Sequence, residues 1–112
     1  MARENTAPGG TGMLLLSLLS RRDMYGYEMI EELRLRSNRI FDLKAGTLYP
    51  LLHTLETQGF VTAYDGMVAG RVRRYYHITD GGRAALAQQA GAWNAYADAV
   101  RGILEGGGLC GA

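Results

Sequence analysis

Apolar residues recur at helical spacing in the first half of the chain. Residues 13–19, MLLLSLL, form an almost continuous apolar run, which predicts a first helix that is buried on most sides. Met29, Ile30 and Leu33 then form one apolar stripe among charged residues, which predicts a second helix. Asp23 is expected to cap this helix by accepting a hydrogen bond from a free amide, and residues 37–39, SNR, are expected to end it.

The clearest pattern lies in residues 44–60, KAGTLYPLLHTLETQGF. Four leucines recur there at helical spacing and predict a third helix: Leu48, Leu51, Leu52 and Leu55. Pro50 is compatible with a helix near its start, so this helix is expected to begin at Gly46 or Thr47. Gly59 is placed to adopt the left-handed conformation that is needed just past the helix end.

Alternation with a period of two replaces the helical pattern after this helix. Residues 60–65, FVTAYD, and residues 71–78, RVRRYYHI, indicate two strands of a β-hairpin, joined by residues 66–70, GMVAG. The second strand has an apolar face, formed by Val72, Tyr76 and Ile78, and a polar face, formed by Arg71, Arg73, Tyr75 and His77. Three helices closed by a hairpin describe a winged helix-turn-helix domain over residues 12–79, a mainly α fold with a β-hairpin (α+β).

A last helix is predicted over residues 80–105, with Thr79 as its cap. Its apolar residues are spaced four, three, four, three and four apart: Leu86, Ala90, Trp93, Ala97, Val100 and Leu104. A heptad seam on a single helix has to be buried against a partner, so a C-terminal dimerisation helix is expected, with Leu86, Trp93, Val100 and Leu104 in the interface. Residues 1–11 are expected to form a disordered arm and residues 106–112 a flexible tail.

Composition limits the classes of function that this protein can have. The 112 residues fit one domain, and a formal net charge of +1 means that only a local cluster of cations could support nucleic-acid binding. The seven-residue apolar run is too short to cross a bilayer and no cleavage site follows it, which predicts a cytoplasmic protein without a membrane partner. His53 and His77 lack a catalytic companion and Cys110 lacks metal-ligand partners, so no enzyme, metal site or cofactor is expected.

Positive charge gathers on the expected wing, the β-hairpin, where Arg71, Arg73 and Arg74 lie within four positions. In a winged helix-turn-helix domain the third helix enters the major groove with its N-terminal residues leading, and the wing lies along the flanking backbone. The three arginines are therefore expected to contact phosphates. Strand alternation places Arg71 and Arg73 on one side and Arg74 opposite.

At the start of the third helix, Lys44, Thr47 and Tyr49 are expected to reach phosphate or sugar. Tyr49 can equally pack under the wing as part of the core. His53, one turn further on, can face the groove or be an ordinary surface histidine. The alternative function is a winged-helix module for protein association without DNA binding, although such domains tend to lack a basic wing.

Residues 46–61, GTLYPLLHTLETQGFV, and residues 71–82, RVRRYYHITDGG, resemble the PadR family of transcriptional regulators. The shared features are the LYP start of the third helix, its Leu-x-x-x-Gly end, the basic residues before a double tyrosine, and Thr-x-x-Gly at the last helix. YGYEMIEEL resembles the family's second helix. The resemblance implies a homodimeric repressor that binds a pseudo-palindromic operator in double-stranded DNA. The apolar tip GMVAG departs from the family and argues against its insertion into the minor groove.

The resemblance extends to Trp93, which follows Gly82 by eleven residues. In multidrug-sensing members of the family, a tryptophan at this spacing lines a pore between subunits, where flat aromatic drugs stack. The resemblance implies a site for a small aromatic ligand at Trp93, and binding there is expected to release the DNA. Ala90 and Ala97, one turn away on either side, are expected to line the site, and Asn94 is expected to supply a polar contact. The alternative for Trp93 is a plain anchor of the dimer interface, a position in which tryptophan is enriched.

Overall fold

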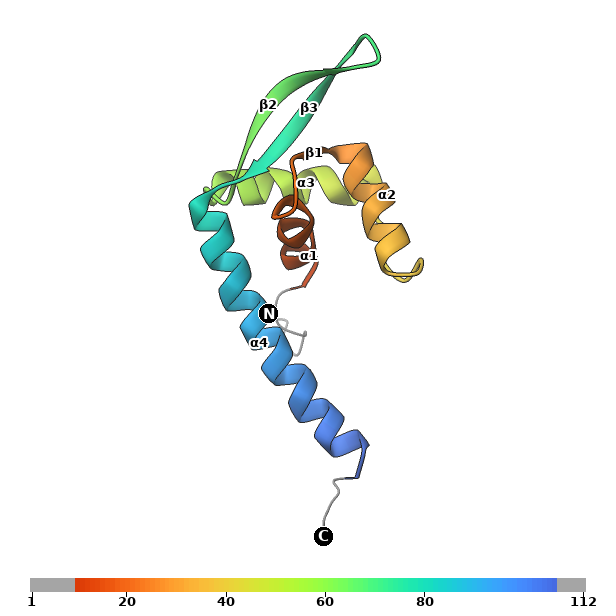
Figure 1. The fold of residues 1–112 in the computed structure, drawn as a ribbon, viewed down its shortest axis with the longest axis vertical. Helices are drawn as coiled ribbons and strands as arrows, with labels where there is room; N and C mark the ends of the chain where they lie inside the picture. Colours follow the sequence, from red (N-terminus) through yellow and green to blue (C-terminus); the bar gives the residue numbers. More distant parts are fainter. Residues whose placement is uncertain (1–9, 107–112) are drawn as a thin grey trace.

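The computed structural model describes residues 10–106. Its elements follow the order α1 (Gly10–Leu19), β1 (Met24–Tyr25), α2 (Gly26–Arg36), α3 (Ala45–Thr57), β2 (Val61–Val68), β3 (Arg71–Ile78) and α4 (Asp80–Leu104). Helices α1 to α3 lie together beside the base of the hairpin, and α4 leads away from them as a long single rod (Figure 1). This arrangement confirms the winged helix-turn-helix fold that the sequence pattern predicted.

The core lies where the three short helices meet the inner face of the sheet. Leu15 and Leu16 of α1 are fully enclosed, as the continuous apolar run of this segment predicted. Helices α2 and α3 and the sheet each bury one side against α1, through Met29, Leu33, Leu48, Leu52, Leu55, Met24, Val61, Tyr76 and Ile78. Burial of this apolar set is the main force that holds α3 and the wing in fixed positions.

The wing is longer than the sequence pattern predicted. Strands β2 and β3 pair from Val61↔Ile78 to Val68↔Arg71, so residues 66–68 belong to β2 and not to the connection. Only Ala69 and Gly70 form the turn, with φ angles of 51° and 77°. Two consecutive residues with positive φ are the signature of the tight type I′ hairpin turn, whose twist matches that of the strands.

A third strand, which the sequence pattern did not predict, joins the wing at its base. β1 pairs with β3 through Met24↔Tyr76 and Tyr25↔Tyr75, which gives the strand order β1-β3-β2. Two residues are too few to show the alternation by which strands are predicted. The strand matters for the wing because it anchors the hairpin to the connection between α1 and α2.

The starts of α1 and α2 differ from the predictions. α1 begins at Gly10, so Gly10 and Thr11 belong to the helix and not to the arm. The N-cap of α2 is Tyr25, whose amide donates to the Glu28 carboxylate at 3.2 Å, so Asp23 does not cap this helix. The other residues of the predicted arm, residues 107–112 of the predicted tail and Cys110 lie outside the described residues.

α3 begins at Ala45, one residue earlier than the sequence predicted. Pro50 therefore lies inside the helix rather than in its first turn. Because proline has no amide hydrogen, the carbonyl of Gly46 lacks its usual helical donor. The predicted end of α3 is confirmed, since Gly59 follows this helix with a φ of 80°.

The predicted cap of α4 is confirmed as well, since the Thr79 hydroxyl accepts a hydrogen bond from the Gly82 amide at 3.0 Å.

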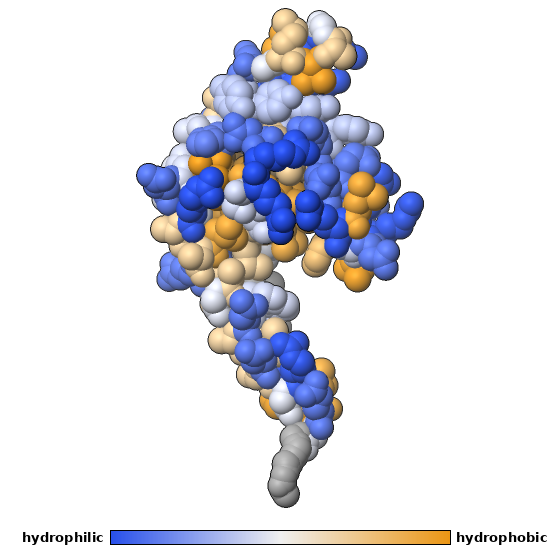
Figure 2. Space-filling model, viewed as in Figure 1, coloured by the Kyte–Doolittle hydropathy of each residue, from blue (hydrophilic) through white to orange (hydrophobic). Residues whose placement is uncertain are grey.

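α4 starts on the domain and then leaves it. Leu86 packs partly against the core of its own chain, so the expectation that the whole heptad seam lacks a partner within the chain is wrong for its first residue. Further along, Trp93 is 38% exposed and Leu104 79% exposed. Hydrophobic residues are visible on the surface of this projecting rod (Figure 2). Among the described residues, no helix combines the length and the apolar character that a membrane span requires.

Candidate nucleic-acid interface

α3 turns one face to the core and the opposite face to solvent. Its buried side is the leucine stripe, and its exposed side consists of Gly46, Thr47, Pro50, His53, Thr54 and Thr57. At the N-terminus the side chain of Lys44 makes no capping hydrogen bond, and the first helical bonds run from Thr47 and Leu48 to the Lys44 carbonyl. The amides of Ala45 and Gly46 precede these bonds, so this end of α3 suits a negatively charged group.

The sequence-predicted residues at this end of α3 occupy different environments. Lys44 is exposed, and its Nζ lies 3.7 Å from Asp42 in a loose ion pair. Thr47 and His53 are exposed on the solvent side of the helix. Tyr49 is 47% exposed, and its hydroxyl end packs against Gly26 at the start of α2. Tyr49 thus belongs partly to the surface and partly to the packing between α2 and α3.

The three wing arginines divide as strand alternation predicted. Arg71 is exposed next to the turn and forms no ion pair with any described residue. The guanidinium of Arg73 lies over the Tyr25 ring, 5.2 Å from its centroid, on one face of the sheet. On the opposite face, Arg74 pairs with Glu56 of α3 at 3.5 Å. Within residues 10–106, Arg71 and Arg73 therefore have no acidic partner, whereas the charge of Arg74 is partly balanced by Glu56.

Three tyrosines form a platform beneath Arg73. Tyr64 and Tyr75 stack with their centroids 5.6 Å apart, and Tyr25 meets Tyr75 edge-on at 5.4 Å. The Tyr75 ring also covers Gly66, where a β-carbon would lie only 2.7 Å from the ring. These contacts hold the outer face of the wing in one arrangement and so restrict the position of Arg73.

Asp23 ties the base of the wing together instead of capping α2. Its carboxylate accepts a hydrogen bond from the Tyr64 hydroxyl at 2.6 Å and lies 2.8 Å from Nδ1 of His77. Burial acts to raise the pKa of Asp23, but the contacts with Tyr64 and His77 outweigh it and hold this pKa below its ordinary value. The same hydrogen bond raises the pKa of Tyr64 to about 12. Sequence reasoning missed this network because its members lie 41 and 54 positions apart.

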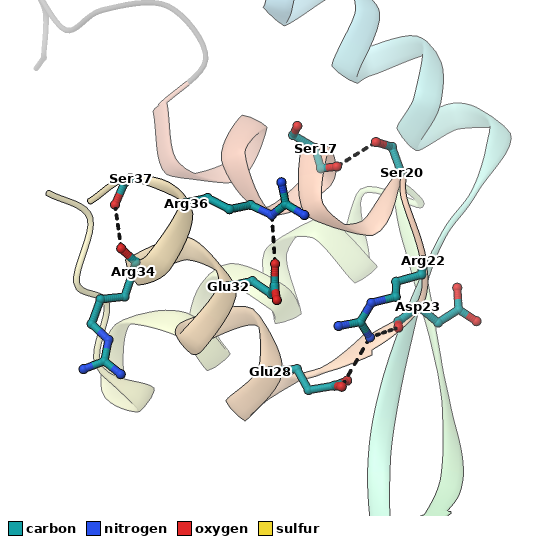
Figure 3. A network of polar contacts seen from close by, with 9 residues as sticks. All are labelled: Ser17, Ser20, Arg22, Asp23, Glu28, Glu32, Arg34, Arg36 and Ser37. Atoms are coloured by element: carbon teal, nitrogen blue, oxygen red, sulfur yellow. Dashed lines mark hydrogen bonds and ion pairs between the residues drawn. The ribbon is translucent and has the colours of Figure 1, made fainter. Parts of the chain in front are cut away.

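Most of the positive charge around α2 is neutralised locally. Glu28 accepts a hydrogen bond from Arg22 at 3.2 Å, and Glu32 accepts one from Arg36 at 2.8 Å (Figure 3). Arg34 pairs in the same way with Glu31 at 2.7 Å. Such exposed pairs add little stability, but they remove net charge from this side of the domain. Arg71 and Arg73 of the wing, in contrast, have no acidic partner among the described residues.

A shallow hollow lies on the projecting part of α4. It is lined by Trp93, Tyr96, Ala97, Val100, Arg101 and Leu104. Of the four residues predicted to bind a ligand, Trp93 and Ala97 line the hollow, whereas Ala90 and Asn94 do not. Sequence reasoning missed Tyr96, whose ring lies 5.8 Å from that of Trp93, although its spacing of three residues could have shown that the two share a face. Within residues 10–106, no three His, Cys, Asp or Glu side chains gather as metal ligands would.

Comparisons with known proteins agree with this interpretation of the fold. An uncharacterized protein of Lysinibacillus sphaericus is 34% identical over 107 residues, which cover 95% of this chain and 98% of that protein. The transcriptional regulator Rv3488 of Mycobacterium tuberculosis is 38% identical over 80 residues, which cover 71% of this chain and 72% of that protein. This chain is thus similar along most of its length to a protein described as a transcriptional regulator.

Solved structures show the same similarity. The crystal structure of a PadR-like transcriptional regulator from Bacillus cereus has a TM-score of 0.78 and 27% identity, over 88% of this chain and 94% of that one. Bacillus subtilis PadR, solved in complex with operator DNA, is similar in fold, with a TM-score of 0.64 and 22% identity over 71% of this chain and 46% of that one. The model of the "Transcriptional regulator PadR-like family", whose members are regulators and not enzymes, matches residues 15–88. This chain therefore belongs to the PadR-like family of transcriptional regulators.

Proposed function

We propose that this protein is a sequence-specific, DNA-binding transcriptional repressor that acts in the cytoplasm as a homodimer on a pseudo-palindromic operator. The observation that carries the proposal is the exposed face and free N-terminus of α3, which lie beside a wing with two unneutralised arginines. The structure of the Bacillus subtilis PadR with operator DNA supports it, because that protein has the same fold.

In the proposed complex, α3 enters the major groove with its N-terminus leading. Lys44, Thr47 and the half-exposed Tyr49 then reach phosphate or sugar, and His53 faces the groove. Arg71 and Arg73 contact the flanking backbone, where a planar guanidinium can bind phosphate with two parallel hydrogen bonds. Arg74 contributes less, because its charge is already shared with Glu56.

The projecting half of α4 supports the homodimer. Trp93, Val100 and Leu104 lie on one side of this helix, and the exposure of Leu104 leaves its apolar surface in water. A second copy covers this surface in a two-fold arrangement and presents two α3 helices. Their separation has to match successive major grooves, which are about 34 Å apart.

The same region supports a site for a planar aromatic ligand. Trp93 and Tyr96 lie side by side with an interplanar angle of 32°, and both line the hollow on α4. In a dimer, a flat molecule stacked between the Trp93 rings of the two subunits separates the α4 helices and so changes the distance between the α3 helices. Since coupling between two binding sites is reciprocal, such a ligand lowers the affinity for DNA.

A gel-shift assay on the DNA just upstream of the gene tests DNA binding, and planar cationic dyes and antibiotics added to the same assay test release. Trp93 is the only tryptophan, so its fluorescence reports ligand binding directly. We expect quenching and loss of the shifted band at the same ligand concentrations, and no loss of the shifted band on addition of ligand to Trp93→Ala. Absence of quenching by every compound, or equal release of DNA from Trp93→Ala and the unchanged protein, would leave Trp93 as an interface anchor only.

A further inference from the structure

The sequence of α3, AGTLYPLLHTLET, contains no Arg, Lys, Asn or Gln. Those four side chains make the common paired hydrogen bonds with guanine and adenine in the major groove. The only acidic residue of α3, Glu56, is engaged by Arg74. If α3 reads bases, it therefore has to do so chiefly with other groups.

Two threonines on the exposed face of α3 turn their hydroxyl groups back onto the helix. The hydroxyl of Thr54 donates to the Pro50 carbonyl at 3.1 Å, and that of Thr57 donates to the His53 carbonyl at 2.9 Å. A hydroxyl that is bonded to a carbonyl four residues earlier faces its own helix, which leaves the γ-methyl group on the outside. Both residues are exposed, so their methyl groups are presented to solvent.

Pro50 extends this apolar surface towards the N-terminus of α3. Pro50, Thr54 and Thr57 are four and three residues apart, which places them on one side of a helix. The Pro50 ring is exposed and carries no hydrogen-bond donor. The C-terminal half of the exposed face of α3 thus carries a row of methyl and methylene groups, which we call the methyl row: Pro50, Thr54 and Thr57.

We propose that the methyl row reads thymines in each operator half-site, through contacts of its methyl groups with the C5-methyl groups that thymine displays in the major groove. The inference rests on the proposed function, because it requires α3 to lie in that groove. Thr54 and Thr57 are then specificity-determining residues, and their hydroxyl groups serve to orient the methyl groups. The arginines of the wing supply affinity that does not depend on sequence.

The test uses the full-length protein and the strongest site that it selects from random-sequence duplexes. Each thymine of a half-site is replaced in turn by deoxyuridine, which removes only the C5-methyl group. Thr54→Ser and Thr57→Ser remove the γ-methyl group but keep the hydroxyl, whereas Thr54→Val and Thr57→Val keep methyl groups and lose the hydroxyl. Thr62→Ser in β2 is the matched control, because Thr62 is also exposed but lies outside α3.

We expect a deoxyuridine at a contacted position, or either serine variant, to weaken specific binding about fourfold for each methyl group removed. A serine variant should lose nothing more on the matching deoxyuridine DNA, and the valine variants and Thr62→Ser should bind as tightly as the unchanged protein. Unchanged affinity of both serine variants, or equal losses on thymine and deoxyuridine DNA, would overturn thymine reading alone. Selection that enriches no sequence would overturn the proposed function and this inference together.

Discussion

The α-carbon of Gly82 lies against the backbone carbonyl oxygen of Phe60, with no room for a side chain between them. A β-carbon at Gly82 would also lie 2.7 Å from the Ile78 side chain. Thr79 fastens the same junction, because its amide donates to the Phe60 carbonyl at 3.0 Å and its hydroxyl donates to the Gly59 carbonyl at 2.6 Å. The Thr-x-x-Gly motif therefore joins the start of α4 to the turn that follows α3.

Gly82→Ala should destabilise the protein, because a backbone carbonyl cannot move aside as a flexible side chain can. We expect a loss of about 2 kcal/mol or more in the free energy of unfolding, measured by thermal denaturation.

Gly81→Ala is the matched control, since a β-carbon at Gly81 would meet nothing closer than 3.6 Å. Helix propensity favours alanine there, so Gly81→Ala should be neutral or slightly stabilising. Equal melting temperatures of the two variants would contradict this account of the junction.

The sequence predicted features that depend on local spacing. The leucine stripe of α3, the cap at Thr79, the left-handed Gly59 and the order of the four helices and the hairpin were all confirmed. Each depends on residues within about two helical turns or on the alternation of one strand, and such patterns are visible along the chain.

Features that depend on contacts distant in sequence were missed or assigned wrongly. Asp23 precedes a helix and was expected to cap it. Its carboxylate instead contacts Tyr64 and His77, which lie 41 and 54 positions later in the sequence. The heptad pattern also could not show that Leu86, at the start of α4, packs partly on the core of its own chain. The two-residue strand β1 carries no periodic signal at all.

Ala69→Asn should stabilise the wing. Ala69 has a φ of 51° and Gly70 has a φ of 77° in the hairpin turn, and Asn-Gly is the pair most favoured in such a turn. We expect a gain of about 0.5–1 kcal/mol in thermal denaturation, because asparagine tolerates the left-handed region better than alanine does. Ala69→Val is the opposite control and should destabilise the protein, since a β-branched side chain is strained at positive φ. A valine variant as stable as the asparagine variant would show that the turn has another conformation in solution.

Arg71→Ala should weaken binding to specific and nonspecific DNA alike. Its charge is exposed and unpaired among the described residues. We therefore expect the slope of the logarithm of the binding constant against the logarithm of the salt concentration to become shallower by about one unit for each phosphate that a subunit no longer binds. Arg73→Ala should show the same change of slope and, in addition, weaker packing on Tyr25. Arg74→Ala is the comparison within the same strand, and its slope should change less because Arg74 pairs with Glu56. Equal slopes for all variants and the unchanged protein would show that the wing arginines are only solvated charges.

Val100→Asp should disrupt the homodimer. Val100 lies beside Trp93 and Leu104 around the hollow on α4, and a buried unpaired charge in an interface costs several kcal/mol. We expect monomers or unfolded protein by light scattering. Ala95→Asp is the matched control, because Ala95 is exposed and two residues past Trp93, on the opposite side of α4, so its dimer should persist. A stable dimer of Val100→Asp that still binds DNA would exclude pairing through this seam.

Asp23 should make the free energy of unfolding depend on pH. The hydrogen bonds from Tyr64 and His77 keep the pKa of Asp23 in the folded protein below its ordinary value, so the unfolded chain binds more protons as the pH falls through this range. The stabilisation is therefore present above about pH 4–5 and is lost as the pH decreases towards the folded-state pKa. Because the Asp23 side chain is 34% exposed, we expect a contribution of only about 0.5–1 kcal/mol.

This effect is measured by thermal denaturation of Asp23→Asn from about pH 3 to about pH 7, a range that includes the titration of ordinary carboxylates. The variant should be less stable than the unchanged protein near pH 7, and the difference should shrink towards pH 3, because protonation removes the charge from Asp23 as well. Asp65→Asn is the matched control: Asp65 is an exposed β2 residue that forms no ion pair or side-chain hydrogen bond with the described residues, and its variant should follow the unchanged protein throughout. A constant difference between Asp23→Asn and the unchanged protein at every pH would mean that Asp23 stabilises the wing through shape alone and not through its charge.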